Sequence, residues 1–197
     1  MPVNGGPVKG GPVKGGPVKG GPTSSQRSGN GGVTRVHATA IAAGNRAVLI
    51  RGPSGSGKSD LALRCLGIAA GPFPDDLLPV RLIADDQVLL TRQGQTLDAK
   101  APATLAGQLE VRGLGILSVG ALPMAAVALV ADIVVADIVS ARSGEPGIER
   151  YPDPWPVTTI AGLAIPVIRI SAFEASAPLK ILLALAHPDL PAVRDCG

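Results

Sequence analysis

The feature that most constrains this chain is a run of residues 52–59, GPSGSGKS, which fits the phosphate-binding loop pattern at every fixed position. The run follows a short apolar stretch, Ala47–Ile50, and precedes a stretch with helical periodicity, which is the context such a loop requires. Glycines let backbone N–H groups curl around phosphate oxygens, and the N-terminus of the next helix favours an anion. The motif therefore predicts binding of a nucleoside triphosphate. The predicted loop residues are Gly52, Pro53, Ser54, Gly55, Ser56, Gly57, Lys58 and Ser59.

Two side chains of the loop have expected roles. Lys58 is expected to reach the β- and γ-phosphates, and the Ser59 hydroxyl is expected to bind Mg²⁺. The alternative is a glycine turn that matches by chance, and the complete pattern in its proper context argues against that. ATP and Mg²⁺ are therefore the expected cofactors.

The apolar pattern of the rest of the chain indicates an α/β fold with a mixed sheet. A helix is predicted over Ser59–Ala69, ended by Gly71-Pro72, and a second over Pro178–Ala186. The polar run 91–96 predicts a hairpin turn between two strands. Short apolar runs bounded by turn residues predict strands at Ala47–Ile50, Val80–Ala84, Val88–Thr91, Gly115–Val119, Ala126–Ala131 and Ala164–Ile170.

Residues 1–32 form a separate region, in which a five-residue unit of the type GPVKG occurs four times, first as MPVNG. This region has too few apolar side chains to offset the entropy of ordering, so it is predicted to be a disordered tail before a catalytic domain at 33–197. The tail holds four basic residues and no acid, whereas the other 165 residues hold 14 basic and 15 acidic residues. The basic pI therefore belongs to the tail and does not indicate a domain that binds nucleic acid.

No targeting or membrane segment is evident. The tail lacks the apolar core of a signal peptide. The most apolar window, Val119–Val139, is interrupted by Pro123, Asp132 and Asp137, which indicates buried strands rather than a membrane span. The chain has two cysteines, which suits a reducing cytosol, and Cys65 falls among apolar helical positions, so we expect a packed thiol in a cytoplasmic protein.

The run RLIADD ends a predicted strand in two adjacent carboxylates, Asp85 and Asp86. After a phosphate-binding loop, an acid at a strand end normally holds the metal. Two adjacent carboxylates that are shielded from water are costly to keep ionised together, so one of them is a candidate proton acceptor. The alternative is a solvated turn, and the residues alone leave both interpretations open.

Three further residues are candidates. Glu110 and Arg112 alternate around Val111, so on an extended chain their side chains face the same way, as a metal-binding carboxylate beside a phosphate-binding guanidinium would. The alternative is a surface ion pair on a strand. His37 precedes the first predicted strand, and a lone histidine is more often structural than functional.

Taken together and in order, these segments resemble the catalytic domain of HPr kinase/phosphorylase, the bacterial enzyme that phosphorylates a serine of the phosphocarrier HPr. The segments are His37, the loop with its helix (GPSGSGKSDLAL), RLIADD, and the run LEVRGLGILSV, which is the most specific of them. The resemblance implies a P-loop fold related to phosphoenolpyruvate carboxykinase. It also implies ATP-dependent phosphorylation of an HPr-type carrier and phosphate-dependent dephosphorylation, in control of the phosphotransferase system and of carbon and nitrogen metabolism.

The resemblance also implies roles for residues. Lys58 and Ser59 would hold phosphate and Mg²⁺, and Glu110 would be a second carboxylate on the metal side. One of Asp85 and Asp86 would be the base toward the serine hydroxyl, with His37 nearby. Arg112 lies in the segment that the family needs for both directions.

The chain also departs from the longer members of this family. Their N-terminal domain is replaced by the repeat tail, as in the short enzymes of alphaproteobacteria, and their arginine-containing loop reads IPVIRISAFEASAPLK here. The family forms hexamers partly through C-terminal helices, so a homo-oligomer is compatible with the resemblance. The competing hypotheses are a nucleotide-dependent switch and a small-molecule kinase; the latter would need an arginine-rich lid, which is not evident in the sequence.

Overall fold

The structure is a computed structural model that describes residues 32–68, 79–135, 148, 152 and 154–187. Residues 1–31 of the predicted tail lie outside the described residues, as does the predicted helix stop at Gly71-Pro72.

The described part contains eleven strands, two α-helices and one short 3₁₀ helix, η2 (Ala103–Leu105). The helices are α1 (Lys58–Leu66) and α3 (Ala177–Ala186). The strands are β1 (Val33–His37), β2 (Thr39–Ala43), β3 (Arg46–Arg51), β4 (Val80–Ala84), β5 (Gln87–Gln93), β6 (Thr96–Lys100), β7 (Gln108–Val111), β8 (Gly115–Ser118), β9 (Ala125–Ile133), β10 (Val157–Ile160) and β11 (Leu163–Ile170).

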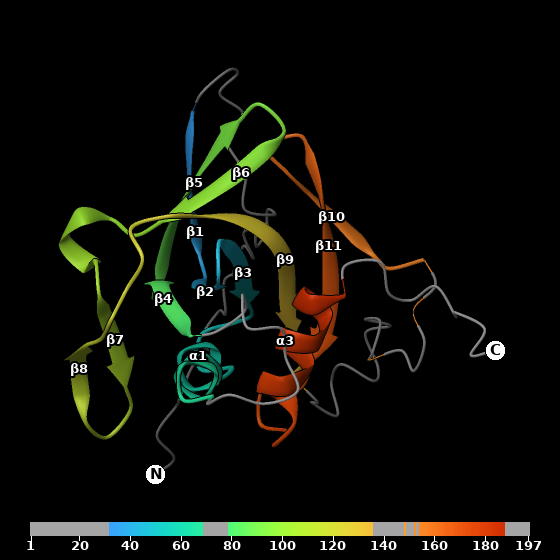
Figure 1. The fold of residues 1–197 in the computed structure, drawn as a ribbon. Helices are drawn as coiled ribbons and strands as arrows, with labels where there is room; N and C mark the ends of the chain where they lie inside the picture. Colours follow the sequence, from blue (N-terminus) through green and yellow to red (C-terminus); the bar gives the residue numbers. More distant parts are fainter. Residues whose placement is uncertain (1–31, 69–78, 136–147, 149–151, 153, 188–197) are drawn as a thin grey trace, which may run out of the picture.

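Nine of these strands form one sheet, in the order β1-β5-β6-β9-β3-β2-β4, with β11 and β10 added beside the second half of β9. β9 runs parallel to β3 and to β11, and the other pairs of strands in this sheet are antiparallel. β7 and β8 form a separate hairpin at one side of the molecule (Figure 1). The predicted α/β class with a mixed sheet is confirmed.

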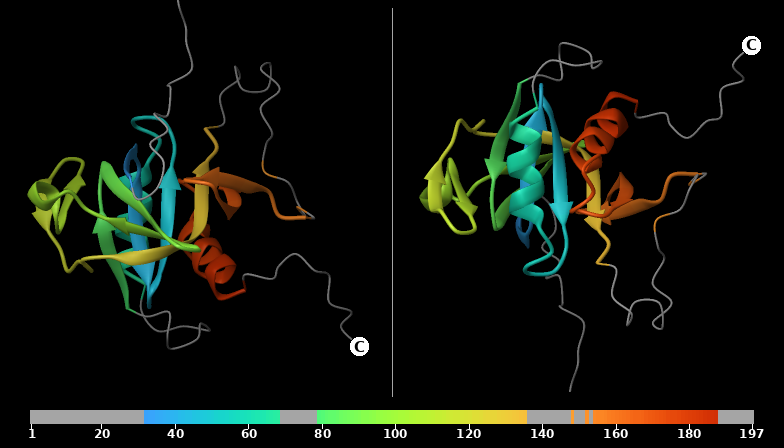
Figure 2. Two further views of the ribbon diagram at one scale, coloured as in Figure 1. Left: turned by 90° about the horizontal axis from the view of Figure 1, so that it is seen from above. Right: turned by 90° about the horizontal axis from the view of Figure 1, so that it is seen from below.

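The sheet is rolled, and its connections show why. β4 lies at one end of the strand order and β5 near the other, yet only Asp85 and Asp86 separate them in the chain. β1 and β2 are likewise joined by Ala38 alone. Such short links bring the two ends of the strand order together, so one face of the sheet is enclosed by the roll (Figure 2).

Two apolar clusters fill the two faces of the sheet. Along β2, Ala40 and Ala42 belong to the cluster shared with β5 and β6, while Ile41 and Ala43 belong to the cluster shared with α1 and α3. All five residues of β2 are buried, as expected for a strand covered on both faces. The enclosed face holds many alanines, because a sheet that curls onto itself leaves little room between its strands.

The structure contains each predicted strand and both predicted helices, with two kinds of correction. The helix over Ser59–Ala69 was predicted too long, because Gly67 occupies its C-cap and donates its N–H to the Leu63 carbonyl at 3.2 Å. Four strands were not predicted, because they are short and either polar or rich in alanine; they are β1, β2, β7 and β10. A fifth, β6, was expected only as the second strand of the hairpin at 91–96, and it does pair with β5. Among the described residues, no helix has the length and apolar composition needed to span a membrane.

Candidate functional site

The candidate site lies where several strands end at the same edge of the sheet. β3 and β4 both run antiparallel to β2, so they run parallel to each other and their carboxyl ends lie at one edge. β3 leads into the predicted phosphate loop and α1, and β4 leads into Asp85 and Asp86. β1 brings its last residue, His37, to the same edge by pairing with Gln87. Ligands of open α/β sheets bind at such carboxyl ends.

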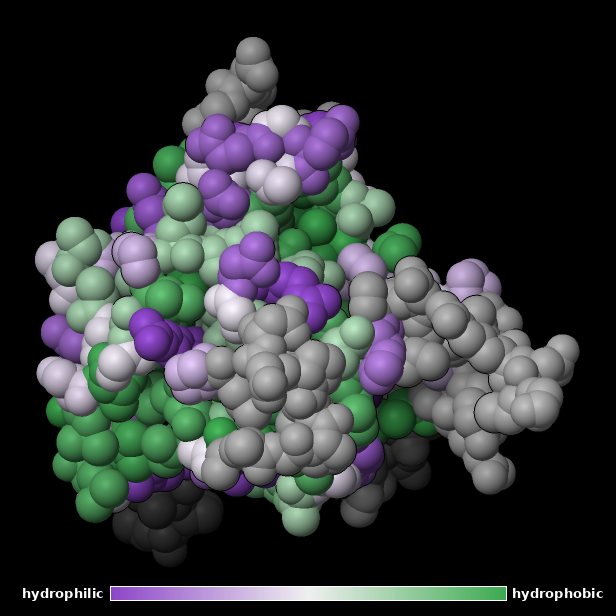
Figure 3. Space-filling model, viewed as in Figure 1, coloured by the Kyte–Doolittle hydropathy of each residue, from purple (hydrophilic) through white to green (hydrophobic). Residues whose placement is uncertain are grey.

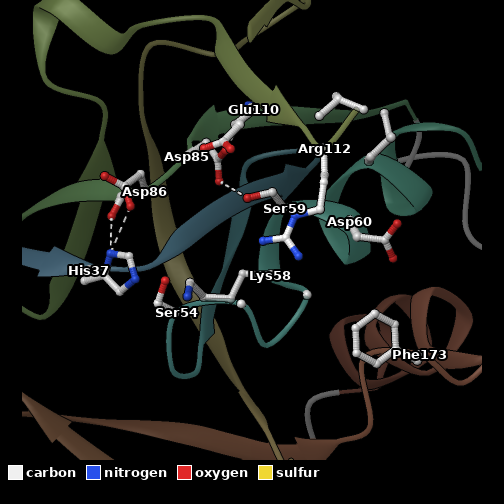
Figure 4. Close-up of a pocket in the computed structure, with 14 residues that line it drawn as sticks. His37, Ser54, Lys58, Ser59, Asp60, Asp85, Asp86, Glu110, Arg112 and Phe173 are labelled. Atoms are coloured by element: carbon white, nitrogen blue, oxygen red, sulfur yellow. Dashed lines mark hydrogen bonds and ion pairs between the residues drawn. The ribbon is translucent and has the colours of Figure 1, made fainter. Parts of the chain in front are cut away.

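A pocket of about 360 Å³ lies at this edge (Figure 4). Most of the predicted site residues line it: His37, Ser54, Gly55, Gly57, Lys58, Ser59, Asp85, Asp86, Glu110 and Arg112. The other lining residues are Asp60, Leu63, Val111 and Phe173. Of the predicted loop residues, Gly52, Pro53 and Ser56 do not line the pocket.

The backbone of the loop needs glycine at specific places. Gly55 and Gly57 have φ values of 78° and 94°, which other residues rarely adopt. A Cβ at Gly52 would lie 2.6 Å from the Ser56 hydroxyl oxygen, so a side chain there would require the Ser56 hydroxyl to move. Ser56 is buried, and its hydroxyl has no hydrogen-bond partner within the described residues. The loop is therefore closely packed around Ser56 and open toward the pocket.

Lys58 lies within the loop and is 7% exposed. Its Nζ donates to the carbonyl oxygens of Gly52 and Pro53, both at 2.9 Å. Burial lowers the pKa of Lys58, although the nearby charges of Asp86 and Asp85 act in the opposite direction. A bound phosphate would add a further anionic partner to this desolvated ammonium group.

Asp85 is buried, and both of its carboxylate oxygens accept hydrogen bonds. Oδ1 accepts from the hydroxyls of Ser59 at 2.8 Å and Thr39 at 2.7 Å, and Oδ2 accepts from the backbone N–H of Glu110 at 3.1 Å. These donors come from α1, β2 and β7. Asp85 therefore joins three elements around the end of β4.

Asp86 has the opposite environment. Its φ is 63°, a left-handed conformation that aspartate tolerates, and its side chain is 62% exposed. The Nδ1 of His37 lies 3.0 Å from both the backbone oxygen and Oδ1 of Asp86 (Figure 4). Both partners accept hydrogen bonds, so Nδ1 carries the proton. The structure thus separates two adjacent carboxylates, one held by three donors and one directed into the pocket.

Glu110 and Arg112 come from the β7–β8 hairpin. Leu109 is fully buried and anchors the hairpin to the main core, whereas Glu110 and Arg112 are exposed and line the pocket. Glu110 is in β7, and Arg112 lies in the turn just beyond it. No ion pair joins the two side chains in the described part of the chain, so both are available to a ligand.

Several residues that support the site were not predicted. Thr39 lies in a strand whose alanine-rich sequence gave no signal. Arg51, immediately before the loop, forms two hydrogen bonds with Asp132 on the paired strand β9, at 2.7 and 2.8 Å. Such an arginine–carboxylate pair at the end of a strand could only be found once the register of the sheet was known.

The donor set at the pocket suits a hard divalent cation. The hydroxyl of Ser59 and the carboxylates of Asp85 and Glu110 are oxygen donors, which Mg²⁺ prefers. The described residues contain no group of three or more acidic, histidine or cysteine side chains that could hold a metal ion alone. The two carboxylates and one hydroxyl fit Mg²⁺, which typically binds with one or two carboxylates and completes its shell with substrate phosphates and water.

Comparisons with known proteins identify the family of the chain. Residues 32–186 match the family model for the HPr Serine kinase C-terminal domain. The HPr kinase/phosphorylase of Nitrosomonas europaea is 44% identical over 73 residues, which is 36% of this chain and 20% of that protein. That of Clostridium acetobutylicum is 39% identical over 86 residues, 44% of this chain and 25% of that protein. The chain therefore spans only a fifth to a quarter of these curated relatives in the matched regions.

A solved structure gives the same fold. The Hpr(Ser) kinase/phosphatase from Coxiella burnetii matches with a TM-score of 0.61 and 21% sequence identity, covering 77% of this chain and 93% of that chain. At this identity the likeness concerns the fold, and it confirms the predicted fold type.

Proposed function

Because the chain belongs to the HPr serine kinase C-terminal domain family, we propose that it transfers the terminal phosphate of ATP to a serine hydroxyl of an HPr-type phosphocarrier protein. The observation that carries this proposal is the separation of Asp85 from Asp86. One carboxylate has three donors and supports the phosphate loop, and the other is exposed in the same pocket beside His37. A pocket that only held a nucleotide would not need the second carboxylate.

The proposed chemistry assigns a step to each group. A serine hydroxyl is a weak nucleophile, so Asp86 accepts its proton as the oxygen attacks the terminal phosphorus and the bond to the leaving diphosphate breaks. His37 donates through Nδ1 to Asp86 and orients that carboxylate. Lys58 and Arg112 stabilise the negative charge that spreads over the transferred phosphoryl group.

The metal has a supporting place in this proposal. When bound, Mg²⁺ neutralises phosphate charge and orients the transferred group. Ser59, Asp85 and Glu110 would hold it, with Asp85 already accepting a hydrogen bond from Ser59 at 2.8 Å.

The relatives are named kinase/phosphorylase, and the same groups suit the reverse process, phosphate-dependent dephosphorylation of the carrier. In that direction, inorganic phosphate attacks the phosphoserine phosphorus, pyrophosphate forms, and the serine oxygen leaves. Asp86 then returns the proton to the leaving oxygen, by microscopic reversibility. Lys58 and Arg112 would bind the attacking phosphate in place of the nucleotide.

The test is a phosphotransfer assay with ATP labelled in the terminal phosphate, Mg²⁺ and an HPr-type carrier, either wild type or with its acceptor serine replaced by alanine. The proposal predicts label on the wild-type carrier alone, and its loss with the Asp86→Asn enzyme. Nucleotide binding without any label on the carrier would overturn the proposal and leave a nucleotide switch. ATP turnover that needs a small molecule instead of the carrier would indicate a small-molecule kinase.

A further inference from the structure

Phe173 is an aromatic side chain that the proposed chemistry does not use. It lies on the loop between β11 and α3, is 73% exposed, and lines the same pocket as the phosphate loop. The chain has only two phenylalanines, one tryptophan and one tyrosine. An aromatic ring at the rim of a polar pocket offers a flat apolar face that a ligand can contact.

The backbone around Phe173 is held in place by α1. Arg64 donates to the carbonyl oxygens of both Ala172 and Glu174, the residues on either side of Phe173. Its Nε also donates to Asp60 at 2.9 Å, which fixes the guanidinium on the helix. Ala172 itself is buried. The ring is therefore presented from a fixed loop, by the helix that begins at the phosphate-binding loop.

The ring also lies against the phosphate loop itself. A Cβ built at Gly57 would lie 3.0 Å from Cζ and 3.2 Å from Cε1 of Phe173. Gly57 is the N-cap of α1, where phosphate oxygens would meet the backbone N–H groups. Phe173 thus lies at the end of the phosphate loop where α1 begins.

The position of Phe173 relative to Asp86 gives the direction of the nucleotide. Figure 4 shows Phe173 on the opposite side of the pocket from His37 and Asp86, with Lys58 and Ser59 between them. If the terminal phosphate points toward Asp86, the other end of the nucleotide extends toward Phe173.

We propose that Phe173 binds the base of the nucleotide by stacking, so that the pocket recognises ATP at both ends. This inference rests on the proposed function for the direction of the bound nucleotide. Stacking of a base on an aromatic side chain typically changes affinity by about 5- to 100-fold. Inorganic triphosphate has no base, so its affinity reports the loop alone.

The test is calorimetric titration of the full chain with MgATP and with magnesium triphosphate, for wild type, Phe173→Ala and Val157→Ala. Val157 is a suitable control because it is 63% exposed but lies outside the pocket. We expect Phe173→Ala to weaken ATP binding about 5- to 100-fold and to leave triphosphate binding unchanged, with no change for Val157→Ala. Equal effects on both ligands, or no effect on ATP, would overturn the inference.

A second variant reports stacking without removing the ring. Phe173→Trp keeps an aromatic face and adds a second fluorophore beside Trp155. After subtraction of the wild-type signal, we expect ATP to quench the fluorescence of the new tryptophan and triphosphate to leave it unchanged. Equal fluorescence changes with both ligands would contradict stacking.

The kinetics separate this inference from the proposed function. Phe173→Ala is expected to raise the KM for ATP while leaving kcat near wild type. Selective ATP binding by a chain that phosphorylates no carrier would overturn the proposed function and leave the stacking intact. A raised KM for the carrier with unchanged ATP binding would instead place the ring against the acceptor protein, and would overturn the stacking.

Discussion

The hydroxyl of Ser59 donates a hydrogen bond of 2.8 Å to Oδ1 of Asp85, and this contact joins the start of α1 to the end of β4. The same oxygen accepts from the fully buried hydroxyl of Thr39. Asp85 is therefore as much a structural residue as a ligand of the proposed metal.

Replacement of Asp85 by alanine is expected to destabilise the fold. It would leave the hydroxyl of Thr39 and the backbone N–H of Glu110 without their acceptor, and we expect a loss of about 2–4 kcal/mol in the free energy of unfolding. Urea denaturation would measure it. A loss below about 0.5 kcal/mol would show that Asp85 has no such structural role.

Asp86 is expected to behave in the opposite way. Asparagine tolerates a φ of 63° as well as aspartate does, and the side chain is 62% exposed, so Asp86→Asn should leave stability within about 0.5 kcal/mol of wild type. Phosphotransfer should fall about 10²- to 10⁴-fold, because the proton acceptor is lost. Nucleotide affinity, measured alongside, should change little. Full activity in Asp86→Asn would show that Asp86 is not the proton acceptor.

Replacement of His37 by alanine tests whether the histidine positions Asp86. Because Nδ1 of His37 contacts Asp86 and no contact with the loop is involved, we expect kcat to fall while the KM for ATP stays near wild type. Replacement by asparagine, whose amide could still donate to Asp86, should recover part of the rate. A change in the KM for ATP alone would show a different role.

Lys58→Met is expected to weaken ATP binding by at least about 100-fold, because the ammonium group that faces the phosphates is lost.

Lys58→Met should also change the pH dependence of the free energy of unfolding. Burial lowers the pKa of Lys58 below 10.5, so the folded state releases this proton before the unfolded state does, and wild type gains stability as pH rises toward 10.5. The variant lacks this gain. Unfolding free energies of both proteins from neutral to alkaline pH would show whether their difference grows in that direction.

Cys65 is expected to be unreactive in the folded protein. Burial raises its pKa to about 12, so the thiolate is scarce at pH 8, and the side chain is fully buried among core residues. In a Cys196→Ser variant, a thiol reagent such as Ellman's should react only as the protein unfolds. Its rate should rise with urea and give one equivalent in the denatured protein. Rapid reaction without urea would show that the Cys65 thiol is accessible in the folded protein.

The sequence was most informative where local chemistry decides structure. The phosphate loop could be predicted because glycine, Lys58 and Ser59 act within a few residues of one another. The choice between Asp85 and Asp86 could not, because it depends on Thr39 and Glu110, which reach Asp85 only through the register of β2 and β7. Phe173 gave no signal for the same reason, since its neighbour Gly57 is far away in the chain.

The two-residue link between β4 and β5 has a consequence for folding cooperativity. Asp85 and Asp86 connect the two ends of the rolled sheet, and both also line the pocket. The enclosed core therefore cannot open at this link without moving residues of the pocket. A bound ligand would therefore stabilise this closure, and amide protons along β4 and β5 would exchange at rates that fall with the fraction of unbound protein. The same two residues therefore contribute both to the pocket and to the stability of the enclosed core.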